Sequence, residues 1–142
     1  MLRVGCGRRG SYGLGAEVEL AVERVRDVAT LTKDGDSFAE GIGQTRVTEN
    51  LEGIVIDDAY RVTDQLALSI VYQLMREEGL FVGLSSGINV AGALRLAREG
   101  GPGQVIVTLL CDSGIRYMSK TFNPEWLVAH GLDPNEPISQ IA

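Results

Sequence analysis

The second half of the chain has an apolar pattern with the period of a helix. Between Asp64 and Glu78 the apolar positions recur at helical spacing, which predicts an amphipathic helix whose buried face carries Leu66, Ile70, Leu74 and Val71. Thr63 or Asp64 is the expected N-cap, and Gly79 is the expected left-handed C-cap.

Two further helices follow from the same kind of pattern. One is predicted from Ile88 to Arg98, with Val90, Leu94 and Ala97 on its apolar face, and the glycines and proline of residues 100–103 end it. The other begins at Asn123 and Pro124, because asparagine is a good cap and proline fits the first helical position.

Short apolar runs between these helices predict strands. Tyr60–Val62 and Leu80–Leu84 are two of them. Val105–Cys111 is apolar without alternation, which is typical of a strand buried on both faces. Strands that alternate with helices predict an α/β fold, an open parallel or mixed sheet covered by helices, with Val105–Cys111 as its central strand.

The first part of the chain has no such period. We expect residues 1–33 to form a poorly ordered N-terminal segment and residues 34–142 to form one domain, with Asp34–Asp58 as a glycine-punctuated loop. Gly5–Gly10 formally matches the glycine pattern of dinucleotide sites. That pattern has to follow a strand and open a helix, and only four residues precede it here, so we do not assign a nucleotide site.

The composition of the chain limits the kinds of partner that it can bind and indicates its cellular compartment. The net charge of −6 argues against nucleic acid or an anionic membrane as partner. No apolar run approaches the roughly 20 residues of a membrane-spanning helix. The two cysteines, Cys6 and Cys111, make no disulfide framework, and Cys111 is expected to be a small buried hydrophobic residue. These features favour the cytoplasm.

Few residues stand out as candidates for chemistry. His130 is the only histidine, and its position before Gly131 suits a cation at a helix C-terminus better than catalysis. The chain has no histidine–cysteine cluster that would hold a metal ion, so no metal site is predicted.

Two serine-containing turns are more informative. Ser85-Ser86-Gly87 and Asp112-Ser113-Gly114 each follow a predicted strand and precede a helix, where α/β sheets bind ligands. Both turns are explained equally well as helix caps.

Three segments resemble cysteine synthase, of the β-family (fold type II) of pyridoxal-phosphate enzymes. They are Glu40-Gly41-Ile42-Gly43-Gln44, the run from Gly79 to Asn89, and the run from Cys111 to Lys120. They occur in the family's order and spacing. The resemblance extends from about Asp34 to about Leu132 and corresponds to the C-terminal half of a larger enzyme.

The resemblance implies a fold, a cofactor and a reaction. The family's transferases use pyridoxal phosphate to convert O-acetylserine and sulfide into cysteine and acetate, so a small amino acid is the implied substrate. It implies that Ser113 hydrogen-bonds the pyridine nitrogen of the cofactor and that Gly41 and Gly43 line the cofactor cleft, where glycine lets the backbone approach a ligand closely. A homodimer or a complementing N-terminal half is the implied protein partner.

The chain departs from the family in the residues that perform catalysis. The family's Schiff-base lysine and its glycine- and threonine-rich phosphate cradle lie earlier in the enzyme, whereas this chain has two lysines, Lys33 and Lys120, and neither fits that place. We therefore assign no catalytic residue and expect a truncated cysteine synthase-like protein that is inactive alone. The alternatives are one chain of a split enzyme, a non-catalytic interaction module and, within the family, a cystathionine β-synthase-like protein.

Overall fold

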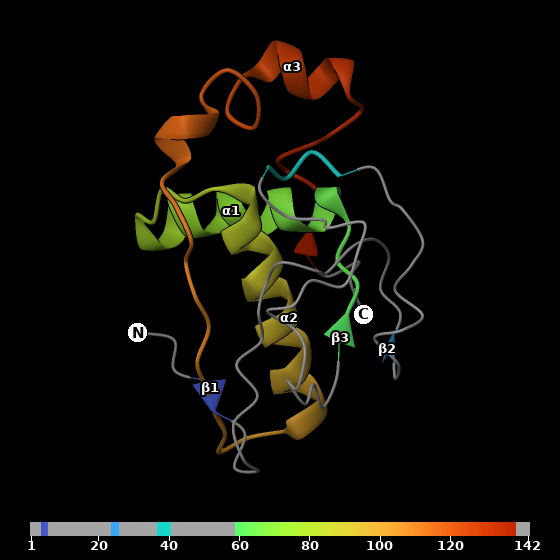
Figure 1. Cartoon of the computed structure of the whole chain (residues 1–142), viewed down its shortest axis with the longest axis vertical. Helices are drawn as coiled ribbons and strands as arrows, with labels where there is room; N and C mark the ends of the chain where they lie inside the picture. The colour runs from blue at the N-terminus through green and yellow to red at the C-terminus, as the bar shows by residue number, and fades with distance from the viewer. Residues whose placement is uncertain (1–3, 6–23, 26–36, 41–58, 139–142) are drawn as a thin grey trace, which may run out of the picture.

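The computed structural model describes residues 4–5, 24–25, 37–40 and 59–138 (Figure 1). Along the chain, its helices and strands are β1 (Val4–Gly5), β2 (Arg24–Val25), β3 (Ala59–Tyr60), α1 (Asp64–Glu78), α2 (Leu84–Gly100), β4 (Val105–Ile106), a 3-10 helix (Gly114–Tyr117) and α3 (Pro124–Ala129). Gly41, Gly43 and most of the predicted 1–33 segment lie outside the described residues.

Helix α1 has the predicted bounds and caps. The Thr63 hydroxyl accepts a hydrogen bond from the Leu66 amide at 3.2 Å, which satisfies one of the free donors of the first turn. Gly79 ends the helix in the left-handed region at φ 69°, where a residue with a side chain would be strained.

Helix α2 begins earlier than the sequence pattern predicts. It starts at Leu84, so Ser85, Ser86 and Gly87 form its first turn instead of a connection to it. The predicted strand Leu80–Leu84 is therefore wrong over most of its length, and only Val82 makes a strand-type contact, an isolated bridge to Ser113. Residues 80–84 have too few backbone partners to extend that bridge into a ladder.

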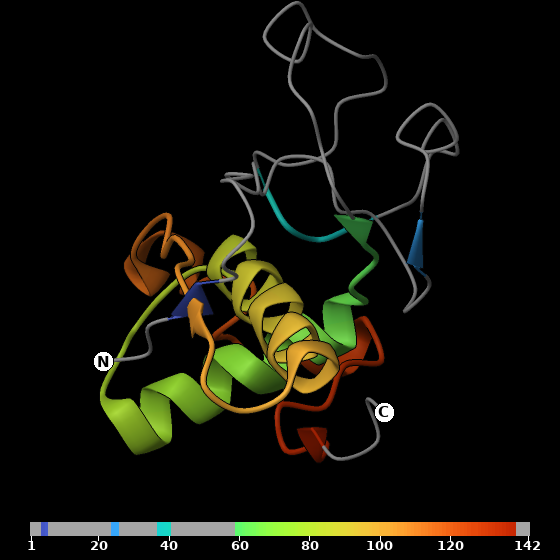
Figure 2. The ribbon, with the colours of Figure 1, turned by 90° about the horizontal axis from the view of Figure 1, so that it is seen from below.

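The hydrophobic core lies where α1 and α2 cross. Figures 1 and 2 show α1 lying across the N-terminal end of α2. Gly87 is at this crossing, where an added side-chain carbon would collide with the Ala67 carbonyl oxygen of α1. The largest fully buried side chains are Leu68, Ile70, Ile88, Val71 and Ser86, all from these two helices.

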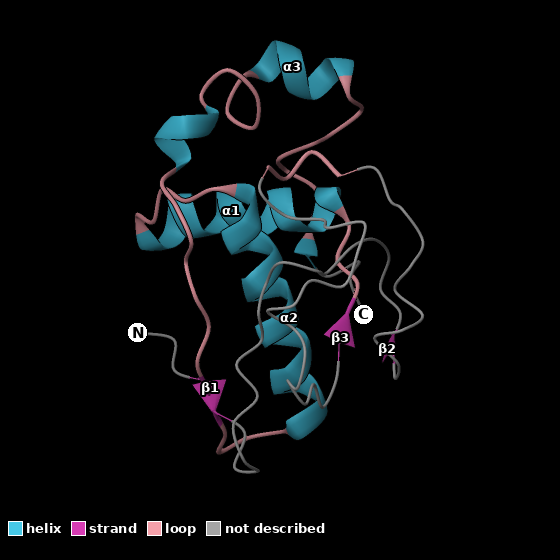
Figure 3. Cartoon of the chain, viewed as in Figure 1, coloured by secondary structure: helices cyan, strands magenta, loops and turns pink. Residues whose placement is uncertain are grey.

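The predicted central strand Val105–Cys111 is wrong. Only Val105–Ile106 forms a strand, and it pairs antiparallel with β1, as β2 does with β3. Figure 3 shows β1, β2 and β3 as short arrows beside the long helices α1 and α2. The described residues contain no parallel strand pair. Val107 is 78% exposed and Leu109 is 67% exposed, because nothing among the described residues lies beside them as a neighbouring strand.

The C-terminal helix α3 (Pro124–Ala129) begins where the sequence predicts it. Asn123 accepts hydrogen bonds from the Glu125 and Trp126 amides and caps α3, with Pro124 at the first helical position. His130 is the C-cap of α3, and its ring stacks on Trp126 at 3.9 Å between centroids. Cys111, predicted to be buried, is exposed because the segment that carries it is not a core strand.

Within the described residues, no helix has the length and apolar character required to cross a membrane.

Candidate cofactor site

The second and third sequence motifs lie against each other. The Gly114 amide donates to the Phe81 carbonyl at 3.1 Å, and the Gly83 amide donates to the Asp112 carbonyl at 3.0 Å. These two bonds flank the antiparallel bridge between Val82 and Ser113. Ser85 and Ser113 are 28 residues apart along the chain, and the two serine turns are thus neighbours in space.

A buried serine reinforces this junction. The Ser86 side chain is fully buried, and its hydroxyl accepts a hydrogen bond from the Cys111 amide at 2.9 Å. One turn further along α2, Asn89 donates to the Leu109 carbonyl at 3.0 Å. Two polar side chains of α2 therefore hold the segment that leads into Ser113.

The start of the first motif lies beside the end of the third. Lys120 and Glu40 form an ion pair. The segment of Glu40 is itself held by Asp64, which accepts hydrogen bonds from the Ser37 hydroxyl at 2.7 Å and from the Phe38 amide at 2.8 Å. Glu40 directly precedes Gly41, so residues of all three motifs are gathered in one region.

Ser113 caps a helix and leaves its hydroxyl accessible to solvent. It is the N-cap of the 3-10 helix, and its hydroxyl oxygen accepts a hydrogen bond from the Ile115 amide at 3.3 Å. A serine hydroxyl also has a proton to donate. Ser113 is exposed, so its hydroxyl is accessible to an acceptor such as a pyridine nitrogen. The residue thus fits the group that the family resemblance implies, whereas Ser85 is buried and does not offer its side chain to a ligand.

Asp112 and Tyr117 form a second polar feature, which the sequence did not single out. The Tyr117 hydroxyl donates to Asp112 Oδ2 at 2.5 Å, and Asp112 Oδ1 is buried without a hydrogen-bond partner. Gly83 lies against both residues, and an added carbon there would come within 2.6 Å of the Tyr117 ring. The five-residue spacing of Asp112 and Tyr117 around the serine turn was the sequence feature that could have indicated this contact.

The contact with Asp112 controls the titration of Tyr117. The hydrogen bond to Asp112, then burial, then the negative charges of Asp112 and Glu40 raise the pKa of Tyr117 to about 12. The folded state therefore favours the protonated phenol. Its stabilisation is complete below pH 10, the ordinary pKa, and is lost as the pH rises from 10 to 12.

We expect a pH titration of tyrosine absorbance to show this shift. The difference between the chain and its Tyr117→Phe variant is expected to report a phenol with a pKa of about 12. Asp112→Asn keeps an acceptor oxygen but removes the charge, so it is expected to lower that pKa toward the ordinary value. An unchanged pKa in Asp112→Asn would contradict this explanation.

Ser86 gives a separate test of the junction between the motifs. We expect Ser86→Ala to destabilise the fold by about 1–3 kcal/mol, because the Cys111 amide loses its acceptor. Ser85→Ala is the matched control, one residue away in the same helical turn. Denaturant unfolding measures the free energy of unfolding of each variant. Faster hydrogen exchange at the Cys111 amide in Ser86→Ala would show that the loss arises at this hydrogen bond. Equal effects of both variants would show that the Ser86 hydrogen bond is not what holds the two segments.

This arrangement of motifs belongs to a known class of protein. Residues 13–112 match the family described as pyridoxal-phosphate dependent enzyme. The chain belongs to this family, whose cofactor is pyridoxal phosphate. The matched residues include Gly41, Gly43 and the segment that leads into Ser113.

Curated relatives point to cysteine synthases within the family. The chain is 46% identical over 106 residues to cysteine synthase 2 of Schizosaccharomyces pombe, covering 73% of this chain and 27% of the relative. It is 41% identical over 100 residues to cysteine synthase of Dictyostelium discoideum, covering 70% of this chain and 26% of the relative. A cystathionine beta-synthase of Dictyostelium discoideum is 40% identical over 96 residues, covering 67% of this chain and 19% of that protein. The chain therefore spans about a quarter of the length of the cysteine synthases that it matches.

A solved structure supports the fold class. A crystal structure of a mutant hydrogen sulfide-producing enzyme, complexed with an alpha-aminoacrylate intermediate, matches with a TM-score of 0.62 and 31% identity. The match covers 68% of this chain and 29% of that one. The fold is therefore part of an α/β fold-type-II domain, although the described strands are too short to form the domain's sheet.

Proposed function

We propose that this chain supplies one side of the cofactor cleft of a cysteine synthase. In this proposal Ser113 hydrogen-bonds the pyridine nitrogen of pyridoxal phosphate, and Gly41 and Gly43 line the cleft. The observation that carries the proposal is the meeting of the family's motifs around an exposed Ser113, whose hydroxyl proton is not used by its own cap.

The residue type at position 113 has a chemical consequence. Pyridoxal phosphate, when bound, supplies the electron sink for replacing the acetate of O-acetylserine by sulfide. A neutral serine donates a hydrogen bond to the ring nitrogen without holding a proton there, as a carboxylate would. Ser113 thereby makes the cofactor ring a weaker electron acceptor, which suits elimination of a good leaving group. Asp112 and Tyr117 hold the backbone on either side of Ser113 through their mutual hydrogen bond.

We further propose that the chain is inactive by itself. Lys120 is paired with Glu40, and its motif is not that of the family's Schiff-base lysine. Lys33 has no family motif around it. The chain also lacks a recognisable glycine- and threonine-rich phosphate cradle, which would carry much of the cofactor's affinity. The proposed location is the cytoplasm, and the proposed organisation is an N-terminal segment 1–33 followed by the cysteine synthase-like part 34–142. The family match begins inside the first segment, at residue 13.

Exposed apolar side chains that follow β4 favour a second candidate, one chain of a split enzyme. Val107 and Leu109 are exposed, and no described strand lies beside them, so a complementing polypeptide would cover them. In that case the partner supplies the lysine and the phosphate cradle. Co-expression with the N-terminal part of a cysteine synthase, followed by an assay for cysteine formation, distinguishes this candidate from the inactive chain.

Two measurements test the main proposal. The chain is mixed with pyridoxal phosphate and reduced with borohydride, and the adducts are mapped; we expect no stoichiometric adduct at Lys33 or Lys120 and no cysteine from O-acetylserine and sulfide. A stoichiometric adduct with turnover would overturn the proposed inactivity.

The proposed contact of Ser113 with the cofactor is tested by a separate binding measurement. Pyridoxamine phosphate, which needs no lysine, is titrated against the chain while amide chemical shifts are followed. We expect the shifts to centre on residues 112–115 and Ser113→Ala to weaken binding about tenfold, the ordinary effect of losing one such hydrogen bond. Ser119→Ala, in the same motif, is the control. Equal binding by Ser113→Ala and the unaltered chain would exclude the assigned contact.

A further inference from the structure

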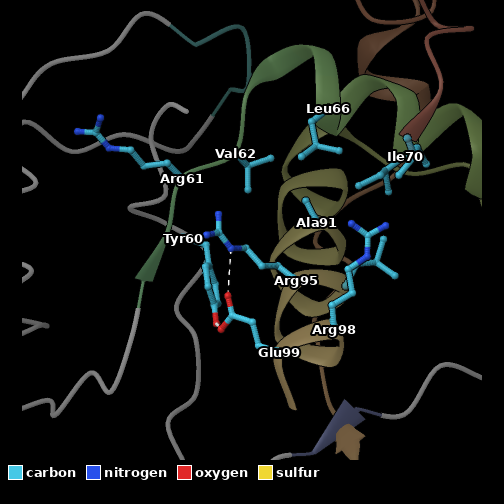
Figure 4. A pocket seen from close by; sticks show the side chains of 11 residues that line it. Tyr60, Arg61, Val62, Leu66, Ile70, Ala91, Arg95, Arg98 and Glu99 are labelled. Atoms are coloured by element: carbon cyan, nitrogen blue, oxygen red, sulfur yellow. Dashed lines mark hydrogen bonds and ion pairs between the residues drawn. The ribbon is translucent and has the colours of Figure 1, made fainter. Parts of the chain in front are cut away.

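A cavity of about 460 Å³ lies away from the cofactor site, between the segment that enters α1 and the C-terminal half of α2 (Figure 4). Its apolar floor comes from Val62, Leu66, Ile70 and Ala91. All four side chains are nearly inaccessible to solvent. The cavity volume is within the range of small-molecule sites, about 300–1,000 Å³.

The wall of this cavity is cationic. Among the described residues, Arg61, Arg95 and Arg98 line it together with one acidic residue, Glu99. Figure 4 shows the Arg61 guanidinium pointing away from the other two, so Arg95 and Arg98 supply the positive charge on the inner wall. This local excess of positive charge stands out on a chain whose net charge is −6.

Both carboxylate oxygens of Glu99 accept hydrogen bonds from residues of this wall. Its Oε1 accepts from Arg95 Nε at 3.2 Å, and its Oε2 accepts from the Tyr60 hydroxyl at 2.8 Å. The Arg95 guanidinium also packs over the Tyr60 ring, 5.0 Å from its centroid, which fixes its position. With this geometry, Arg95 Nη1 is buried and has no hydrogen-bond partner.

A buried guanidinium donor without an acceptor is costly, and a bound carboxylate would supply that acceptor. From the apolar floor, the cationic wall and the unpartnered Arg95 Nη1, we infer that this cavity is a binding site for a small aliphatic carboxylate. The carboxylate pairs with Arg95, with the charge of Arg98 alongside, and the aliphatic chain lies over Leu66, Ile70 and Ala91.

This site is separate from the cofactor region. Arg95 is nine residues from Ser86 along α2, about 13 Å at the helical rise of 1.5 Å per residue. The inference therefore stands whether or not Ser113 binds pyridoxal phosphate. The sequence did not indicate the site, since arginines at positions 95 and 98 look like the solvent face of an amphipathic helix.

The test uses three probes that share one branched aliphatic chain. They are 4-methylpentanoate, N-acetyl-L-leucine, whose carboxylate resembles a peptide C-terminus, and the uncharged 4-methylpentan-1-ol. Titrations of the full chain are followed by calorimetry and by amide chemical shifts. We expect 4-methylpentanoate to bind with a Kd of about 1 mM, a value typical for a ligand of this size, and at least about tenfold more tightly than the alcohol. Tighter binding of N-acetyl-L-leucine would identify a peptide C-terminus as the source of the carboxylate, and tighter binding of 4-methylpentanoate would identify a free acid.

Two variants with a matched control make the test specific. Arg95→Gln is expected to weaken carboxylate binding about tenfold and to leave binding of the alcohol unchanged. Arg76→Gln is the control, because Arg76 also packs over a tyrosine ring, Tyr72, but lies outside this cavity. Ala91→Leu, which fills the floor, is expected to abolish binding of all three probes. Equal affinity for acid and alcohol, no effect of Arg95→Gln, or shifts that map away from residues 91–98 would each overturn the inference.

Discussion

Gly87→Ala is expected to destabilise the fold by about 1–3 kcal/mol, although alanine is the better helix former. The added carbon would collide with the Ala67 carbonyl oxygen and come within 2.8 Å of Val71 Cγ2. The carbonyl belongs to the backbone of α1, so it cannot move aside as a flexible side chain would. Relief of the collision requires α1 and α2 to separate at the place where the core is most buried.

The matched control is Gly92→Ala in the same helix. Nothing lies within 4 Å of the carbon that this substitution adds. We therefore expect it to stabilise the fold by about 0.5–1 kcal/mol through the gain in helix propensity. Midpoints of denaturant unfolding compare the two variants. The same sign for both would mean that α1 and α2 do not cross closely at Gly87.

Leu68→Ala is expected to cost about 3–5 kcal/mol. Leu68 is 1% exposed and belongs to the core formed by α1, α2 and their flanking segments. Its neighbours come from two rigid helices that cannot collapse fully into the space that the substitution leaves. Domains of this size hold about 5–15 kcal/mol of net stability, so this substitution would remove a large fraction of it.

Two controls separate cavity formation from other effects of substitution. Leu68→Met keeps most of the buried volume and is expected to cost less than about 1.5 kcal/mol. Val128→Ala removes apolar atoms from a side chain that is 80% exposed, so its effect is expected to remain within about 0.5 kcal/mol. Thermal and denaturant unfolding give the free energies. A cost of Leu68→Ala no greater than that of Val128→Ala would refute the core described here.

The helices and caps were predictable from sequence because their signals are local. Thr63 and Gly79 bound α1 as expected, and Asn123 caps α3. Each of these residues satisfies backbone groups within a few positions of itself. The start of α2 was misplaced because Ser85-Ser86-Gly87 looks like a turn, and only the close packing of Gly87 against α1 shows why glycine occurs inside that helix.

The sheet was not predictable in the same way. An apolar run such as Val105–Cys111 indicates what a segment would bury, but not which segments lie beside it. A buried strand needs partners from elsewhere in the chain. Within the described residues only β1 pairs with this run, so Val107, Leu109 and Cys111 are exposed.

The candidate cofactor site was predicted in part. The structure places the two serine turns side by side through the Val82–Ser113 bridge, although the strands that we expected to precede them are not formed. The roles assigned to Ser113, Gly41 and Gly43 remain predictions. The Asp112–Tyr117 bond and the cationic cavity could not be anticipated, because they depend on side-chain directions that spacing does not fix.

The exposed run Val105–Cys111 has a consequence for the behaviour of the chain at high concentration. Its seven residues contain no charge and no proline, a composition prone to pairing between chains and to cross-β stacking. A net charge of −6 opposes such association in dilute solution, but its repulsion is screened beyond about 8–10 Å at physiological salt. We therefore expect self-association of this protein through this segment to increase with ionic strength.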